Sequence, residues 1–152
     1  MLELVSQRWN IDTLQTMKKT VLITGASSGI GKELSLLFAQ EGWNLVVVAR
    51  NKEKLSKLAK DIEVNHQVKA LVIAKDLSNP DAAQSIKHQL DEKGITIDAL
   101  VNNAGFGSQG TFSSLDLYNE LNMIDLNIRS LTELTGLFLP DMMKRGSGKI
   151  LN

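Results

Sequence analysis

The sequence has no cysteine, and among its 152 residues only two are proline and two are histidine. The lack of cysteine excludes disulfides, thiolate nucleophiles and Cys-type zinc sites, and it favours a reducing, cytoplasmic location. His66 and His88 lie far apart in sequence in polar surroundings, so we expect no His-based metal site and no bound metal.

The sequence also has no excess of one sign of charge and no long hydrophobic run. Seventeen Lys and Arg balance seventeen Asp and Glu, so no net field would recruit nucleic acid or an anionic membrane. No run reaches the roughly eighteen apolar residues of a membrane span. A small neutral or anionic ligand is therefore the expected partner.

Residues 1–16 carry two acids and lack an apolar segment of signal-peptide length, so we do not expect an export signal. We expect an N-terminal extension here, either an upstream addition before a start at Met17 or a loosely docked, poorly ordered arm. Residues 17–152 are of suitable length for one domain.

Short apolar runs alternate with longer amphipathic stretches along most of the chain. The predicted strands centre on residues 21–23, 45–48, 68–74 and 97–101, and the predicted helices on 30–40, 52–64 and 80–93. Pro80 suits the first helical position, where its missing N–H does no harm. Strands that are apolar on both faces and alternate with helices predict an α/β fold with a parallel, helix-covered sheet.

The last predicted helix, residues 116–145, is the longest, and Pro140 should kink or divide it near its end. It carries two apolar rows, one of Leu117, Leu121, Ile124, Ile128, Leu131 and Phe138, the other of Met123, Leu126, Leu134 and Leu137. Core packing alone explains one of the two rows, and for the other we expect a contact with a second copy of the chain in a homo-oligomer. Residues 149–151 begin a fifth strand that is cut short at Asn152.

The most informative segment is VLITGASSGIGKEL, residues 21–34. An apolar strand leads into a glycine-rich turn and a helix, which aims backbone N–H groups and the positive end of a helix dipole at one point. This pattern predicts a dinucleotide pyrophosphate site. Glu33 follows Gly31-Lys32, so the Gly-Lys-Ser/Thr ending of an ATP-binding P-loop is missing. Glycines that serve only the turn are the alternative.

Three further signals follow in order: Asp76-Leu77 after the third strand, Asn102-Asn103-Ala104-Gly105 after the fourth, and Asn127 in the long helix. With the glycine turn, they make residues 19–152 resemble the short-chain dehydrogenase/reductase family. The resemblance implies a Rossmann-like, doubly wound parallel sheet, incomplete at its fifth strand, that binds NAD(H) or NADP(H) at the carboxyl ends of its strands.

The resemblance also implies roles for individual residues. Around the pyrophosphate and adenosine ribose it places Gly25, Ser27, Ser28, Gly29, Ile30 and Gly31. Asp76 would accept a hydrogen bond from the adenine amino group, with the Leu77 backbone beside it; an Asx turn with Ser78 is the alternative for this carboxylate. Along the ribose and nicotinamide path it places Asn102, Ala104 and Gly105, whereas Asn103 would mainly tie strands together.

The end of the second strand bears on the choice of cofactor. NAD-preferring members of the family usually carry an acid there, but this strand continues into Arg50, Asn51 and Lys52. The Arg50 guanidinium suits a phosphate, and Ser27 or Asn51 could donate as well. We therefore expect NADP(H) to be preferred, with NAD(H) possible. The alternative is that Arg50 and Lys52 only begin a solvated helix.

Catalysis in the family relies on Asn, Ser, Tyr and Lys together. Asn127 matches the Asn, but Tyr118 precedes it and has Asn122 instead of Lys four positions later. We expect an NADP(H)-dependent oxidoreductase that interconverts small carbonyl and alcohol substrates in its full-length form. The 152-residue chain, ending before the catalytic Ser, Tyr and Lys, should be inactive. A non-catalytic NADP(H)-binding sensor or interaction protein is the alternative.

Overall fold

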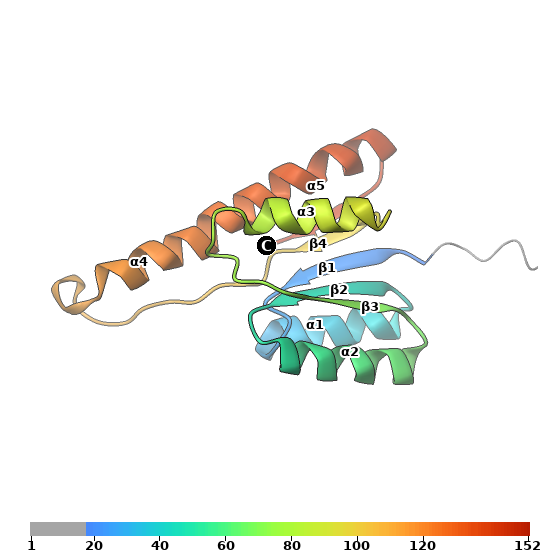
Figure 1. Ribbon diagram of the computed structural model, residues 1–152, viewed down its shortest axis with the longest axis horizontal. Helices are drawn as coiled ribbons and strands as arrows, with labels where there is room; N and C mark the ends of the chain where they lie inside the picture. Colours follow the sequence, from blue (N-terminus) through green and yellow to red (C-terminus); the bar gives the residue numbers. More distant parts are fainter. Residues whose placement is uncertain (1–17) are drawn as a thin grey trace, which may run out of the picture.

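The computed structural model describes residues 18–152, so the predicted extension at residues 1–16 lies outside the described residues. The described chain forms a five-stranded sheet in the order β3-β2-β1-β4-β5, with every neighbouring pair parallel. Helices cover both of its faces (Figure 1). The predicted α/β class and the Rossmann-like, doubly wound sheet are confirmed.

Strands and helices alternate as the apolar pattern predicts. The strands are β1 Thr20–Thr24, β2 Asn44–Ala49, β3 Ala70–Ala74, β4 Ala99–Val101 and β5 Lys149–Leu151. The first three helices are α1 Gly29–Gln40, α2 Lys52–His66 and α3 Ala82–Glu92. In the register of the sheet, Leu22 of β1 lies between Val46 and Leu100.

The start of α3 differs from the prediction, because Pro80 precedes the helix instead of opening it. The N-cap residue is Asp81, and the Ala82 amide donates to the Asn79 carbonyl at 3.1 Å. This hydrogen bond closes a turn that contains Pro80. The helix begins at Ala82, two residues later than predicted.

The two faces of the sheet carry separate apolar cores. Alternate residues of a strand point to opposite faces, so Val21 and Ile23 pack in the core under α1 and α2 while Leu22 packs in the other core. Helices α3 and α5 cover that second face, and α4 projects beyond the sheet at the end toward which the strands run (Figure 1). The sheet is therefore buried on both sides, as a parallel sheet requires.

The predicted helix over residues 116–145 is not one continuous α-helix. It consists of α4 Leu117–Ile124, a π-helical segment Asp125–Ser130, and α5 Leu131–Arg145. The irregularity lies at the π-helical segment, and α5 runs through Pro140 without dividing there.

The predicted apolar row is divided at the π-helical segment, because α4 projects beyond the sheet and none of its residues is buried (Figure 1). Phe138 of that row is buried, whereas Leu117, Leu121, Ile124 and Ile128 are exposed. The apolar row therefore reaches the core only along α5.

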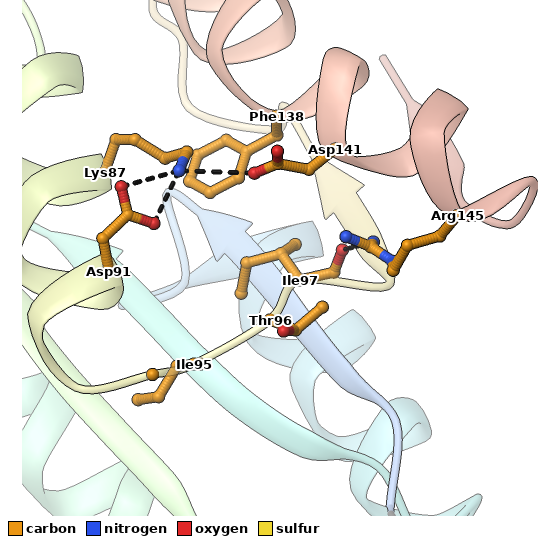
Figure 2. Close-up of a pocket in the computed structure, with 9 residues that line it drawn as sticks. Lys87, Asp91, Ile95, Thr96, Ile97, Phe138, Asp141 and Arg145 are labelled. Carbon is orange, nitrogen blue, oxygen red and sulfur yellow. Dashed lines mark hydrogen bonds and ion pairs between the residues drawn. The ribbon is translucent and has the colours of Figure 1, made fainter.

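Charged side chains join α3 to α5 at the amino end of β4 (Figure 2). The Lys87 ammonium lies 2.7 Å from one Asp91 oxygen and 3.3 Å from an Asp141 oxygen, above the Phe138 ring. The hydrogen bond to Asp91, followed by that to Asp141, raises the pKa of Lys87 against the opposing effect of burial. Arg145 donates to the Ile97 carbonyl at 2.8 Å. These contacts hold α5 against α3 and the start of β4. They lie at the opposite end of the strands from the glycine turn.

Candidate functional site

A cleft of about 620 Å³ opens where β1, β2 and β3 end. All of the predicted cofactor-binding residues line it except Gly31 and Asn102. Residues that the sequence pattern did not indicate, or indicated for another role, also line it: Ala49, Lys54, Lys75, Asn103 and Leu126. Five segments distant in sequence thus meet at the carboxyl edge of a parallel sheet, where open α/β folds bind ligands.

The β1–α1 turn leaves its backbone open to the cleft. Gly25 and Gly29 adopt φ of 68° and 54°, values that favour glycine. Nothing lies within 4 Å of where a Gly29 side chain would begin. Ser28, the N-cap residue of α1, makes no side-chain capping hydrogen bond. The N–H groups at the start of α1 are therefore left without a side-chain cap, an arrangement that fits a phosphate.

Gly31 is also required, but for packing behind the turn. A Cβ atom at Gly31 would overlap the Asn103 amide nitrogen and the Gly25 carbonyl. Because Gly31 has no Cβ atom, α1 can start close against the segment that follows β4. The structure thus places Gly31 behind the residues that line the cleft.

Thr24 and Asn103 join the ends of β1 and β4. The Thr24 hydroxyl donates to the Val101 carbonyl at 3.2 Å and accepts from the amides of Asn103 and Ala104 at 3.0 and 2.9 Å. The Asn103 side chain donates to the Thr24 carbonyl at 2.9 Å. These bonds fix Ala104 and Gly105 at the cleft wall. The sequence signal for this contact was Thr24, a polar residue that directly follows the apolar run of a predicted buried strand.

Asn102 points to the other side of the strand and lies outside the cleft. Its amide nitrogen donates to the Thr135 hydroxyl at 3.1 Å and to the Asn152 side chain at 2.9 Å. Successive strand residues face opposite sides, so Asn102 and Asn103 cannot both point into one cleft. Asn102 instead ties β4 to β5 and α5, and Asn103 is the residue that lines the cleft.

One wall of the cleft is basic. Arg50, Lys54 and Lys75 line it, and Asp76 is the only acidic residue among the lining residues. The Asn51 side chain accepts from the Lys54 amide at 2.9 Å as the N-cap of α2, so its oxygen is engaged and its amide nitrogen is the group that could donate to a ligand. Charge and donors on this wall suit an anionic ligand.

Asp76 makes the Asx turn that was the alternative to its predicted ligand contact. Its Oδ1 atom accepts from the Ser78 amide at 3.0 Å and from the Ser78 hydroxyl at 2.8 Å. Both bonds go to one carboxylate oxygen, so the turn and a ligand contact through the other oxygen are compatible.

Asn127 lies in the π-helical segment, and it does not line the cleft. Its side chain donates to the Phe106 carbonyl at 2.8 Å and accepts from the Phe106 amide at 3.1 Å. Gly105 passes so close that a Cβ there would be 3.0 Å from the Asn127 oxygen. Asn127 therefore holds the segment after β4 against the helix. Tyr118 is 71% exposed on α4, away from the cleft.

The comparison with protein families agrees with this geometry. The profile described as short chain dehydrogenase matches residues 19–152, which include every element of the sheet and the whole cleft. The chain belongs to the short-chain dehydrogenase family. The predicted resemblance is thereby confirmed.

Relatives of this short-chain dehydrogenase include a ketoacyl reductase and a sulfoacetaldehyde reductase, the latter from Chromohalobacter salexigens and 35% identical over 133 residues, which cover 87% of this chain and 52% of that protein. The ketoacyl reductase HetN of Nostoc sp. is 36% identical over 134 residues, which cover 88% of this chain and 46% of that protein. The chain spans about half the length of the curated relatives it matches. Within residues 18–152, no helix is both long and apolar enough to cross a membrane.

Solved structures match the fold closely. A short-chain dehydrogenase from Sphingobium yanoikuyae in complex with NADPH is 36% identical with a TM-score of 0.81, covering 87% of this chain and 51% of that one. The L-sorbose reductase of Gluconobacter frateurii, complexed with NADPH and L-sorbose, is 32% identical with a TM-score of 0.82, covering 88% and 51%. This short-chain dehydrogenase thus has the fold of nicotinamide-dependent oxidoreductases.

Proposed function

We propose that the chain binds NADP(H) in the cleft at the carboxyl edge, and that the full-length protein is an oxidoreductase interconverting a carbonyl and an alcohol. The observation that carries the proposal is the cleft itself, where an uncapped helix start faces a basic wall. The NADPH-bound structures of similar chains support the choice of cofactor.

Each part of the cleft fits one part of the dinucleotide. The backbone of the β1–α1 turn, from Gly25 to Ile30, would hold the pyrophosphate, since it offers N–H groups and the positive end of α1. Arg50 and the Asn51 amide nitrogen would hold a 2′-phosphate on the ribose, and Asp76 with Leu77 would face the adenine. Ala104 and Gly105 would line the path toward the nicotinamide.

The nicotinamide, when bound, supplies or accepts the hydride. The described residues of this chain would bind and orient the cofactor, but none of the residues that line the cleft is a tyrosine: Tyr118, the one tyrosine of the sequence, is on the exposed surface of α4. General acid-base chemistry needs a proton-donating group within hydrogen-bond reach of the reacting oxygen. We therefore propose that the 152 residues bind cofactor without turning it over.

A fluorescence titration of the 152-residue chain with NADPH and NADH tests this function. We expect saturable binding of both, tighter for NADPH, and no cofactor oxidation when a panel of aldehydes and ketones is added. No binding at millimolar cofactor would contradict the proposed binding, and carbonyl-dependent NADPH oxidation would contradict the proposed inactivity.

We also propose that two copies of the chain associate through α4. The supporting observation is the exposed row of Leu117, Leu121 and Ile124 on α4, with spacings typical of one helical face. Leu121→Glu should shift sedimentation toward the monomer, whereas Val64→Glu, which changes a still more exposed apolar residue on α2, should not. A wild-type chain that is monomeric at 100 micromolar or so would contradict association at the usual micromolar strength.

A further inference from the structure

Lys54 occupies a position that the stability of α2 does not explain. It lies in the first turn of α2, where the helix dipole is positive and a cation is unfavourable. Lys52 is in the same turn, and Glu53 is the one acid there. Within residues 18–152, no carboxylate forms an ion pair with the Lys54 ammonium. The interaction of the Lys54 ammonium with the helix dipole is therefore unfavourable, and no neighbouring side chain in residues 18–152 compensates it through an ion pair.

The surroundings of Lys54 show what could offset this unfavourable interaction. Its side chain lines the cleft together with Arg50 and Asn51, the two residues between β2 and α2. Its backbone amide is already engaged by the Asn51 side chain at 2.9 Å, which fixes the first turn of α2 beside the cleft. An anion at this place would interact with two side-chain cations and with the positive end of a 15-residue helix.

We propose that Lys54 is a specificity-determining residue that binds the 2′-phosphate of NADP(H) opposite Arg50. The proposal rests on the proposed function, since it concerns the same cleft. Lys75 also lines this wall, but it follows β3 directly and is adjacent to Asp76, on the part of the cleft proposed for the adenine. The ligand chemistry that Lys54 recognises is a phosphate monoester on the ribose, which NAD(H) lacks.

Two fragments of the cofactor isolate this contact from the rest of the site. The probe 2′,5′-ADP carries the 2′-phosphate, and 5′-AMP is the same nucleoside phosphate without it. We expect the wild-type chain to bind 2′,5′-ADP more tightly than 5′-AMP in calorimetric titrations. Lys54→Ala should weaken 2′,5′-ADP binding by about five- to tenfold, the range between an exposed ion pair and a charge-assisted hydrogen bond. It should change 5′-AMP binding less than twofold.

Lys57 provides the matched control. It lies one helical turn further along α2, is exposed and does not line the cleft. Lys57→Ala should leave both affinities unchanged, and Lys54→Arg should retain most of the affinity for 2′,5′-ADP. A second measurement separates binding from folding: removal of a cation from a helix start should leave the Tm of the free Lys54→Ala chain unchanged or raise it by about 1–3 °C.

The outcomes separate this proposal from the proposed function. Equal losses for both probes, or no loss for either in Lys54→Ala, would overturn the role of Lys54 while cofactor binding stands. A wild-type chain that binds both probes equally well would overturn it too, and would indicate an NAD(H) site. A wild-type chain that binds neither probe nor NADPH would overturn the proposed function and the role of Lys54 together.

Discussion

Two helices, α1 and α2, begin beside the same cleft, but their first turns are built differently. Ser28 leaves the start of α1 without a side-chain cap, and Gly29 adds no side chain above it. At α2, Asn51 caps the helix, and cationic side chains stand around the cap. The difference indicates that α1 offers backbone donors to a group shared by all dinucleotides, whereas α2 offers side chains that discriminate between them.

The largest expected effect comes from closing the space behind the start of α1. Gly31→Ala would drive a methyl group into the Gly25 carbonyl and the Asn103 side chain. We expect the free energy of unfolding to fall by about 2–3 kcal/mol, because backbone on one side cannot move away. Urea denaturation measures the change.

Gly136 is the control for this substitution. It lies inside α5, and nothing is within 4 Å of the place that a Cβ atom would take there. Gly136→Ala should be neutral or stabilise the chain by up to about 1 kcal/mol, since alanine is the better helix former. Equal effects at the two glycines would contradict the close packing assigned to Gly31.

A smaller effect should follow from giving α1 the kind of cap that α2 has. Ser28→Asp would place a carboxylate at the helix start, where it stabilises the free chain by about 0.5–1 kcal/mol. The same charge would repel the pyrophosphate, so affinity for NADPH and NADH should both fall by about tenfold or more. Ser28→Asn caps without the charge and should weaken binding less. Unchanged affinity in Ser28→Asp, measured by titration, would place the pyrophosphate elsewhere.

The smallest effect should come from removing the cap of α2. Asn51→Ala should lower the free energy of unfolding by about 1 kcal/mol, because the Lys54 amide loses its acceptor. Asn51→Asp keeps an acceptor and adds an acid beside the ribose, so it should retain stability and shift the preference from NADPH toward NADH. A denaturation series and paired cofactor titrations measure both. An unchanged cofactor ratio in Asn51→Asp would show that α2 does not discriminate.

The sequence predicted the alternation of strands and helices because their apolar patterns are local. Val21 to Ile23 and Leu45 to Val48 are fully apolar, as buried parallel strands must be. The glycine turn was recognisable for the same reason, since the strand, turn and helix that define it are contiguous. The family and its fold followed from motifs in a fixed order.

Features that depend on distant contacts were not predictable. The π-helical segment leaves no local sequence signal, and the sequence does not show where the helix passes the end of the sheet, so that Ile128 is exposed while Phe138 packs in the core. Asn103 ties β4 to β1 as expected, but it also lines the cleft, and the Asn102 side chain turns away toward α5 and the end of β5, because side-chain direction at the end of β4 depends on pairing with β1 and β5. Lys54 and Lys75 reach the cleft only because α2 starts beside the end of β3. The cytoplasmic location and the residue roles in cofactor binding stay predictions.

Amide hydrogen exchange of the 152-residue chain with and without NADPH tests the central claim most directly. NADPH should slow exchange most strongly at the amides of Gly29, Ile30 and Gly31, which the structure leaves without a side-chain cap, and less at α2, where Asn51 already protects the Lys54 amide. Protection confined to α4 or to the amino ends of the strands, or no protection at saturating NADPH, would contradict a cofactor site at the start of α1.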